Sequence, residues 1–370
     1  MIYYAAYYGE KGVRTSNYAA EDKIDYICDA IVATGEKVQI ISSASSVTGK
    51  RERRGKRQLA ENKEVVYFTS LSGKNKLSRL MDLVIEKLQF LFYILTHIGK
   101  GDTLIVYHSM GYGNWLQFLH RIKKFRYILE VEELYQYIKA NKSKYKSRED
   151  DIIRGADAYI VSNSSIGSRI CHDEKKIVVV NGVYKMERDR GILKRQNAIV
   201  YAGTVEPQKG IDYVMEAAPF LPKEYQIHIA GFGNSLDVKR LKKRIEELNQ
   251  KGGAEIFFDG AFKGEEYTKF LQSFKVGICI QRPDDEFNQY EFPSKVLSYM
   301  SNGLKVVCNE LPQLKSSSIF PYLYIAQSTD PEAVAQTIVH AFSAESQSAE
   351  MIMNELNEKF IREMRGLLNG

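Results

Sequence analysis

Hydrophobic residues along the chain fall into short continuous runs, separated by longer stretches with helical spacing. The runs are rich in valine, isoleucine and tyrosine, a pattern typical of strands buried on both faces of a parallel sheet. In the first half, the predicted strands begin at Ile2, Val38, Val65, Thr103, Tyr127, Ala158 and Lys176. The stretches between them predict helices, among them Tyr18 to Thr34, Leu77 to Ile98 and a short helix around Trp115. The pattern therefore predicts a βα repeat.

The same alternation restarts after a polar and charged stretch from Tyr184 to Arg195. Strands are predicted to begin at Ala198, Ile227, Glu255, Val276, Lys305 and Tyr322. Two such blocks predict an α/β protein with two doubly wound, Rossmann-like domains that face each other across a ligand cleft. We expect the first domain to span residues 1–185 and the second 186–345. The remaining segment, 346–370, contains a final helix that we expect to cross back to the first domain.

Length and cysteine usage agree with this organisation. The chain has 370 residues, 44% of them hydrophobic, and single cores stop growing near roughly 250–300 residues, so two cores are expected. The four cysteines are far apart and form no C-x-x-C pair, which indicates reduced core residues of a cytoplasmic protein. They are Cys28, Cys171, Cys279 and Cys308. The N-terminus has no basic region before an apolar run, so we expect a first strand and no secretion signal.

Charge is concentrated in the first half. Residues 1–185 hold 30 Lys and Arg against 21 Asp and Glu, whereas residues 186–370 hold 22 against 25. Six of the eight residues from Lys50 to Arg57 are cationic, and further clusters lie at Arg121 to Arg126 and Lys139 to Arg148. Such clusters favour anionic surfaces such as membranes or nucleic acid. For Lys50 to Arg57, a solvated loop without a partner is an equally open interpretation.

The predicted helix from Leu77 to Ile98 carries an apolar stripe. Its members are Leu77, Leu80, Met81, Val84, Leu88, Leu91, Phe92, Leu95 and Ile98. The longest uncharged run of this helix is shorter than the roughly 20 residues needed to span a bilayer. Two interpretations stand: the stripe packs on the sheet, or it lies in a membrane interface and, with Lys50 to Arg57, docks the protein on anionic lipid.

Two segments of the second half predict an anion site. In FPSKVLSYMSNG, Pro293 suits the first position of a helix that Asn302 and Gly303 end, and Lys295 adds a full charge at its start. In YAGTVEPQKG, Gly203 ends a strand and Lys209 lies at the start of the next helix. Both segments would face one diphosphate.

Four segments of the second half resemble a known family in their order and spacing. They are YAGTVEPQKGIDYVMEA, IHIAGFG, FDGAFKGEEYTKFLQSFKVGICI and FPSKVLSYMSNGLKVV. They resemble the donor-binding half of glycosyltransferase family 4, retaining sugar transferases of the GT-B fold, in a variant with an F-P-S-K helix. In the first half, ADAYIVSN and KIVVVNGV are similar to the strand pair that closes the family's N-terminal domain.

The resemblance implies that a hexose is transferred, with retention, from a UDP- or GDP-linked donor to a glycan or lipid-linked acceptor. It also implies a role in cell-surface polysaccharide synthesis and no metal ion or other cofactor. A cytoplasmic protein is expected, with peripheral binding at the inner face of the plasma membrane as an open alternative. No nucleic-acid partner is expected.

The resemblance also implies donor-binding residues. Lys209 matches the family's phosphate lysine, while Thr204 stands where an arginine is common, so Lys295 is the candidate for the missing charge. Tyr290 and Ser298 stand at the positions of the family's two glutamates. The full predicted donor set is Gly203, Thr204, Lys209, Gly231, Gly233, Ala261, Phe262, Tyr290, Pro293, Ser294, Lys295 and Ser298.

Glu291, beside Tyr290, is the predicted carboxylate for the donor sugar hydroxyls and, with His108 and Lys209, makes up the predicted catalytic set. The acidic run Asp284, Asp285 and Glu286 is either a substitute for the missing second glutamate or a solvated loop. His108 resembles a histidine that the family places beside the transferred sugar, with a structural role as the alternative. On the acceptor side, the resemblance implies Gly9, Gly12 and a carboxylate at a strand end, Glu130, which Glu132 and Glu133 follow.

Other functions stay open. A nucleotide-sugar 2-epimerase uses the same two-domain architecture, and a non-catalytic adaptor for membranes or nucleic acid would explain the basic first half. A nicotinamide dehydrogenase is disfavoured, because neither YYGEKG nor AGFGNS completes the G-x-G-x-x-G pattern.

Overall fold

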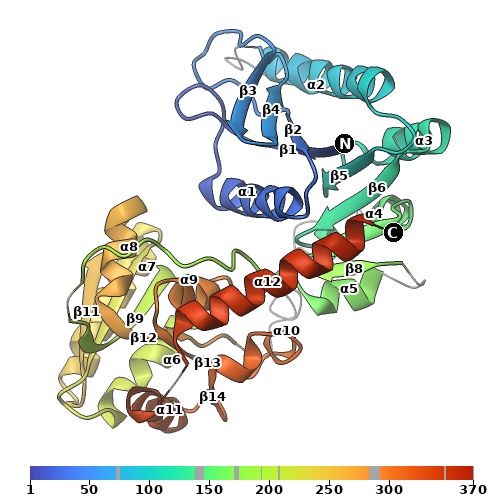
Figure 1. Ribbon diagram of the computed structural model, residues 1–370. Helices are drawn as coiled ribbons and strands as arrows, with labels where there is room; N and C mark the ends of the chain where they lie inside the picture. The colour runs from blue at the N-terminus through green and yellow to red at the C-terminus, as the bar shows by residue number, and fades with distance from the viewer. Residues whose placement is uncertain are drawn as a thin grey trace. The chain divides into compact units, whose positions relative to one another are not determined.

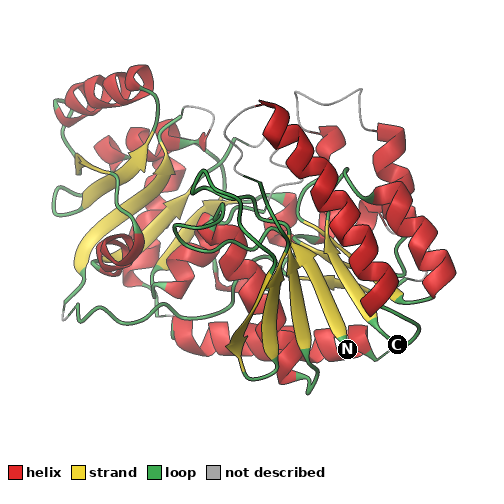
Figure 2. Cartoon of the chain, turned by 90° about the horizontal axis from the view of Figure 1, so that it is seen from above, coloured by secondary structure: helices red, strands yellow, loops and turns green. Residues whose placement is uncertain are grey.

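The computed structural model describes residues 1–71, 76–137, 146–170, 175–192, 194–206, 209–282, 292–345 and 347–369 (Figure 1). The chain divides into two compact units. The first unit consists of residues 1–183 and 358–370, and the second of residues 184–357. Each unit contains one sheet with helices packed on it (Figure 2).

The sheet of the first unit has the strand order β3-β4-β2-β1-β5-β6-β7-β8. All neighbouring strands are parallel except β3, which runs antiparallel to β4. The bounds are β1 Ile2–Ala6, β2 Val38–Ser42, β3 Gly55–Ala60, β4 Lys63–Tyr67, β5 Thr103–Tyr107, β6 Arg126–Val131, β7 Ala158–Val161 and β8 Ile177–Val179. The predicted parallel sheet is thus confirmed.

Strand β3 was not predicted, and it corrects the interpretation of the segment from Lys50 to Arg57 as a loop. Its residues Gly55, Lys56 and Arg57 pair with Tyr67, Val66 and Val65 of β4. Both cationic side chains are exposed. An exposed edge strand of charged residues has no apolar run, which is why the hydrophobic pattern does not indicate it.

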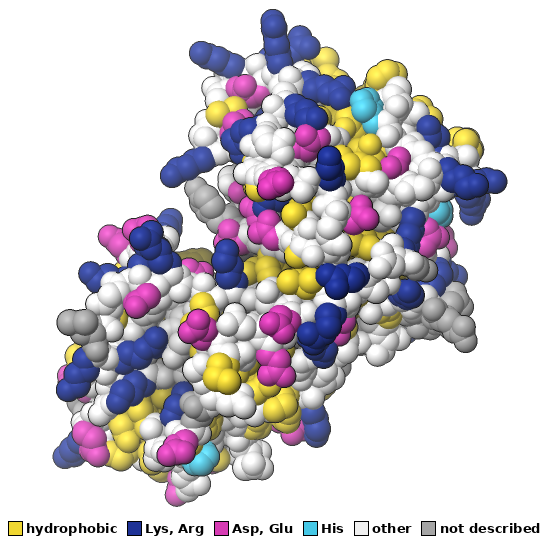
Figure 3. Space-filling view, in the orientation of Figure 1, with side chains coloured by type: hydrophobic (Ala, Val, Ile, Leu, Met, Phe, Trp, Pro, Cys, Tyr) yellow, Lys and Arg dark blue, Asp and Glu magenta, His cyan; other side chains and the backbone are white. Residues whose placement is uncertain are grey.

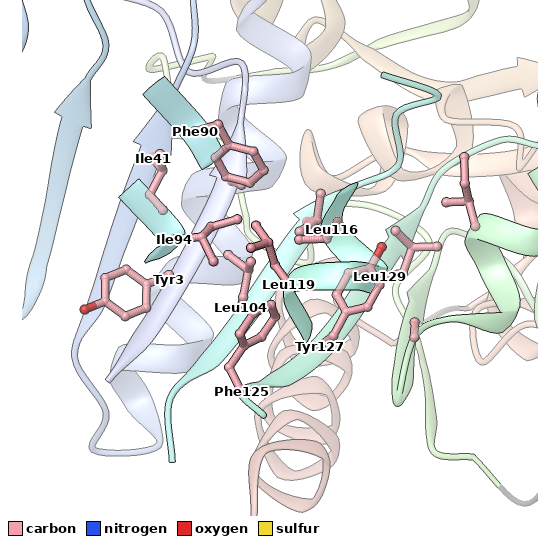
Figure 4. Close-up of a cluster of buried hydrophobic side chains, with 14 of the residues drawn as sticks. Tyr3, Ile41, Phe90, Ile94, Leu104, Leu116, Leu119, Phe125, Tyr127 and Leu129 are labelled. Carbon is pink, nitrogen blue, oxygen red and sulfur yellow. The ribbon is translucent and has the colours of Figure 1, made fainter. Parts of the chain in front are cut away.

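The helices of the first unit lie on its sheet, and α2, α3, α4 and α5 share one buried core. Their bounds are α1 Tyr18–Ala33, α2 Lys76–His97, α3 Gly113–Lys123, α4 Lys146–Arg154 and α5 Ser164–Ile170, with the 3₁₀ helix η1 Tyr135–Tyr137. Figure 4 shows Phe90 and Ile94 of α2 among Leu104 of β5 and Leu116 and Leu119 of α3. The core fixes α2 and α3 beside each other.

Helix α2 packs with the face opposite to the predicted one. Phe90, Tyr93 and Ile94 are buried, whereas most of the predicted stripe is exposed. The exposed members are Leu80, Met81, Val84, Leu88, Phe92 and Leu95. The helix does pack on the sheet, as one of the two interpretations predicted, but mainly with this aromatic face. Of the predicted stripe, Ile98 is buried and Leu91 is partly buried against the core.

The sheet of the second unit is entirely parallel, with the order β11-β10-β9-β12-β13-β14. Strands run β9 Gln196–Thr204, β10 Gln226–Phe232, β11 Glu255–Gly260, β12 Phe274–Cys279, β13 Lys305–Asn309 and β14 Tyr324–Ala326. Helices run α6 Ile211–Glu216, α7 Ser235–Asn249, α8 Gly264–Gln272, α9 Lys295–Ser301, α10 Pro312–Lys315 and α11 Pro331–Ser343, with 3₁₀ helices η3 Ala218–Phe220 and η5 Phe320–Tyr322. The strand order reverses direction between β9 and β12, so the sheet is doubly wound.

The last helix, α12 Ala349–Leu368, starts in the second unit and ends in the first. In its first-unit part, the ring of Phe360 stacks on Tyr26 of α1 with centroids 5.1 Å apart. Arg126 and Lys176 donate hydrogen bonds to the carbonyls of Leu368 and Gly366. These contacts tie the end of α12 to the first core.

Two smaller findings complete the fold. Cys28, Cys279 and Cys308 are buried and free, while Cys171 lies outside the described residues. No helix in the described part of the chain is both long and apolar enough to cross a membrane.

Candidate functional site

The second unit has its candidate site at the carboxyl ends of β9 and β12, where the strand order reverses. In doubly wound sheets, ligands bind in the crevice at this point. Gly203 and Thr204 are the last residues of β9, and α9 follows β12. Because β9 and β12 are neighbours in the sheet, the two segments predicted to bind one anion lie side by side.

Lys295, the first residue of α9, lies directly over Gly203. A Cβ atom on Gly203 would be only 2.2 Å from Cε of Lys295, so a larger residue here would displace the end of this lysine. The Lys295 ammonium donates a hydrogen bond of 3.1 Å to the Tyr201 hydroxyl and lies 4.4 Å from the centre of that ring. The Tyr201 hydroxyl in turn donates to the carbonyl of Thr204 at 2.8 Å. Tyr201 thus holds both the lysine and the loop.

Helix α9 is fixed on the sheet by Tyr299, which is fully buried. Its hydroxyl accepts a 2.8 Å hydrogen bond from the amide of Ala202 on β9. Its ring fills the space over Gly277 of β12, where a Cβ would lie 2.4 Å from the ring. Burial raises the pKa of the Tyr299 hydroxyl well above its usual value, so it stays protonated.

The predicted start of this helix needs a correction. Pro293 and Ser294 precede the helix: Ser294 is its N-cap, and Lys295 is the first helical residue. The amide of Val296 bonds to the carbonyl of Pro293 at 2.9 Å, so a turn leads into the helix. The predicted end is confirmed, since Gly303 adopts a positive φ of 75° after Asn302.

The loop after β9 returns toward the sheet at Lys209 and Gly210. The Lys209 carbonyl lies 3.5 Å from the Tyr201 hydroxyl. Gly210 has a φ of 78°, and a Cβ there would meet the carbonyl of Ile280 at 2.0 Å. The backbone of Lys209 therefore lies near the tyrosine that holds Lys295. Residues 207 and 208 are outside the described ranges.

The remaining predicted donor residues lie along the same edge of the sheet. A Cβ on Gly231, near the end of β10, would be 1.8 Å from the Gly203 carbonyl, and one on Gly233 would be 2.7 Å from Val205. Ala261 is exposed after β11, and the ring of Phe262 stacks on Phe270 at 4.3 Å. Gly231 and Gly233 thus pack against residues at the end of β9 and just after it. Ala261 and Phe262 follow β11, which lies two positions from β9 in the sheet.

Ser298, at the position of the family's second glutamate, has its hydroxyl 3.4 Å from the Tyr267 hydroxyl of α8. Tyr267 and Tyr201 were not predicted as site residues, since a tyrosine in an apolar run is usually a core residue. Tyr290, Glu291 and the acidic run 284–286 lie outside the described residues. Within the described ranges, no group of three His, Cys, Asp or Glu is arranged to hold a metal ion.

The first unit has a separate cavity of about 170 Å³ at the carboxyl ends of β1 and β5. This is the place where the strand order of its own sheet reverses. The walls are mainly aromatic, with Tyr7, Phe68, Phe90, Tyr107, Tyr112 and Tyr135 around His108. A mainly apolar pocket with few polar groups is typical of a ligand site.

His108 lines this cavity, and one of its two ring nitrogens makes a hydrogen bond. Its side chain is 2% exposed, and Nε2–H donates to Oε1 of Glu149 at 2.8 Å. Glu149 is fully buried and also accepts from the backbone amides of Tyr135 and Gln136. Among the residues that the structure describes, Nδ1 of His108 has no hydrogen-bond partner. Glu149 therefore fixes the ring so that Nδ1 can accept a bond from a hydroxyl.

Glu149 was missed by the sequence analysis because it belongs to a polar helical stretch that resembles a solvated surface. Glu130 is the last residue but one of β6, so it lies near the strand end as predicted, but its carboxylate is buried. It is 1% exposed and accepts a hydrogen bond from the Tyr4 hydroxyl. Burial, with the nearby Glu132 charge, raises its pKa from 4.5 to about 8.

The two predicted glycines of the first loop differ in their surroundings. A Cβ on Gly9 would lie 2.5 Å from the Thr15 carbonyl, and its amide donates to Glu21 at 3.0 Å. Gly12 has a φ of 76° with open space around it. Gly9 is thus required by close packing and Gly12 by its backbone conformation.

Comparison with known protein families supports the predicted resemblance of the second unit to glycosyltransferases. The family model described as "Glycosyl transferases group 1" matches residues 196–344. This match covers the β9 loop, α9 and the strands between them. It is broader than family 4, so family 4 and the F-P-S-K variant stay predictions. No curated protein matches the sequence significantly.

Solved structures match nearly the whole chain at low sequence identity. The apo structure of OtsA has a TM-score of 0.63 and 9% identity, covering 99% of this chain and 97% of its own. HepE from Anabaena, in complex with UDP and glucose, has a TM-score of 0.61 and 12% identity, with 99% and 98% covered. The pneumococcal O-GlcNAc transferase GtfA, in complex with UDP and GlcNAc, has a TM-score of 0.60 and 11% identity, with 99% and 98% covered. The chain has the GT-B fold, and the prediction of two Rossmann-like domains is confirmed.

Proposed function

We propose that the protein is a retaining glycosyltransferase that moves a hexose from a nucleotide-diphosphate sugar to a glycan or lipid-linked acceptor in cell-surface polysaccharide synthesis. The position of the Lys295 ammonium over Gly203, at the switch point of the second sheet, carries this proposal. UDP is the first nucleotide to test, because two of the similar structures were solved with it.

On the donor side, the departing diphosphate gains negative charge as its bond to the sugar breaks. The ammonium groups of Lys295 and Lys209 would stabilise this charge without a metal ion. Such preorganised charges lower the barrier because they are in place before the reaction. Glu291 is proposed to bond the donor sugar hydroxyls.

On the acceptor side, we propose that the sugar hydroxyl that reacts binds in the aromatic cavity of the first unit. His108 would accept a sugar hydroxyl hydrogen at Nδ1, in an orientation that Glu149 fixes. In the retaining mechanism that the resemblance implies, the acceptor hydroxyl attacks the face from which the diphosphate leaves, and the diphosphate takes its proton. Because Glu130 is buried, we propose that it influences the acceptor only through Tyr4, whose hydroxyl donates a hydrogen bond to it.

The proposed location is the cytoplasm, at the inner face of the plasma membrane. Six cations between residues 50 and 57 support this location, since their side chains are exposed and anionic lipid attracts them. A lipid-linked acceptor would then be available where the enzyme binds.

The decisive test compares Lys295→Ala and Lys209→Ala with Lys251→Ala, an exposed lysine before β11 at the other end of the sheet. UDP should raise the melting temperature of the wild type and of Lys251→Ala, because a ligand that binds the native state stabilises it. We expect each site variant to weaken UDP binding by about ten- to a hundredfold, the value of a lost charge-assisted hydrogen bond. The turnover rate of Lys209→Ala should fall by a larger factor than its affinity for UDP.

Equal UDP shifts in all four proteins would contradict the site, and so would full turnover of Lys209→Ala with an active donor. The unliganded melting temperatures control for folding. Product analysis with and without acceptor separates transfer from 2-epimerisation, since an epimerase changes the donor sugar when no acceptor is present.

A further inference from the structure

Helices α2 and α3 of the first unit expose an unusual number of large apolar side chains. Phe92 of α2 is 61% exposed and Trp115 of α3 is 65% exposed. The exposed apolar residues are Leu80, Met81, Leu83, Val84, Leu88, Phe92 and Leu95 on α2, and Trp115, Phe118 and Ile122 on α3. We call these ten residues the α2–α3 face. Apolar patches of this size on a soluble protein mark interaction surfaces.

The two helices pack against each other, so the patch spans both. Phe90 of α2 contacts Tyr112, just before α3, with ring centroids 4.6 Å apart. At the other end, Lys123 donates a 2.8 Å hydrogen bond to the carbonyl of Leu95. Figure 3 shows hydrophobic side chains with Lys and Arg beside them over these helices.

Internal bonds prevent α2 from turning this patch inward. Both of its carboxylates point into the unit: Asp82 accepts bonds from the Leu71 amide and the Ser70 hydroxyl. Glu86 accepts bonds from the hydroxyls of Tyr7 and Tyr112. A rotation of α2 would expose Phe90 and break these bonds. The outward apolar face is therefore a fixed feature of the fold.

The exposed charges that the two helices themselves carry are of one sign. Both α2 carboxylates are buried and α3 has none, so the exposed charges of the described residues of these helices are cationic. They include Lys87 and Arg121, and Lys124 follows directly. On the β3 side, the Arg54 guanidinium lies 5.2 Å from the ring centre of Tyr93, which joins the basic segment 50–57 to α2.

We propose that the α2–α3 face inserts into the surface of an anionic lipid bilayer, with the basic segment and the helix cations against the headgroups. An apolar face on helices whose exposed charges are cationic complements a membrane, whose surface is negative and whose interior is apolar. Trp115 suits this position because its ring is favoured at the membrane interface. This inference names the surface by which the proposed enzyme reaches its membrane, and it adds α3 to the two segments that the sequence indicated.

The test uses Trp115 directly, because it is the only tryptophan in the chain. Its fluorescence should shift to shorter wavelength when vesicles of phosphatidylcholine and phosphatidylglycerol are added, and lipids brominated in their tails should quench it. The double variant Trp115→Phe with Phe220→Trp moves the probe to the second unit, where Phe220 is 54% exposed. This control should bind the vesicles without a shift.

Cosedimentation measures the affinity, without donor or acceptor, so it is independent of the proposed activity. We expect Leu88→Ser with Phe92→Ser, and Trp115→Ser with Phe118→Ser, to weaken vesicle binding by at least about tenfold each. Phe220→Ser is the matched control and should bind as the wild type. All substituted side chains are exposed, so the folds should persist.

Three results would overturn the proposal. The first is no binding of the wild type to these vesicles. The second is loss of binding in Lys50→Ser with Arg51→Ser and Arg53→Ser but full binding of both apolar variants, which would indicate headgroup attraction alone. The third is a wild-type dimer that the apolar variants dissociate without any change in vesicle binding, which would assign the face to a second copy.

Discussion

At the scale of single residues, Tyr201 and Lys295 lie 94 positions apart in sequence and share one hydrogen bond. The sequence analysis identified Gly203 and Lys295 by their residue types, because a glycine loop and a lysine are what a phosphate needs. It could not identify Tyr201 or Glu149, because their roles depend on partners that only the fold brings near. The same holds for Glu130, whose burial is set by the surrounding core.

Glu130 also predicts a pH dependence of stability. Its folded pKa of about 8 lies above the ordinary value of 4.5, so the folded state binds the proton more tightly than the unfolded state. The stabilisation is complete below about pH 4.5 and is lost as the pH rises to about 8, at up to about 1.4 kcal/mol per pH unit. Urea unfolding between pH 5 and 8 should show this slope in the wild type. Glu130→Gln should show a flatter dependence, and an equal slope in both proteins would contradict the assignment.

At the scale of elements, the hydrophobic pattern located most strands and helices well. Buried parallel strands show it clearly because they are apolar on both faces. It failed where an element is charged and exposed, as in β3, and where a helix is apolar on more than one side, as in α2. For α2, the bonds of Asp82 and Glu86 decide which face turns inward.

Helix α9 offers a prediction at this scale. Tyr299→Phe keeps the ring over Gly277 but leaves the buried Ala202 amide without its partner. We expect the free energy of unfolding to fall by about 1–3 kcal/mol, and the UDP-induced rise in melting temperature to shrink, because α9 carries Lys295. Chemical denaturation and thermal shift with UDP measure the two effects. Tyr213→Phe, a partly buried tyrosine of α6 in the same unit, is the control. Unchanged values in Tyr299→Phe would show that the hydroxyl does not position the helix.

At the scale of the whole molecule, α12 belongs to both units. Its last part is held by Tyr26, Arg126 and Lys176 of the first unit, while Glu355 accepts a hydrogen bond from Tyr322 of the second. A final helix that crosses back to the first domain was predicted. Its individual partners were not predictable, because they come from α1, β6 and the residue before β8, far away in the sequence.

The stability of the first unit should depend on this helix. Phe360 is 1% exposed, and Phe360→Ala would leave a cavity beside Tyr26. We expect a loss of about 3–5 kcal/mol in the free energy of unfolding. Denaturation followed by limited proteolysis would show early cleavage in residues 1–183. The exposed Met351 of the same helix provides the control Met351→Ala, which should unfold as the wild type does. Equal stability of Phe360→Ala would contradict the role of the helix end in the first core.

The sequence by itself determined the two mainly parallel sheets, the glycine and lysines of the predicted anion site, and the concentration of positive charge in the first half. These features are local: they depend on runs of apolar residues, on glycines at strand ends and on composition. Only the tertiary structure decided which face of α2 is exposed, that Tyr201 and Tyr299 hold the donor loop and α9, and that Glu149 orients His108. Those features depend on contacts between distant segments, and such contacts form only when each unit buries its core.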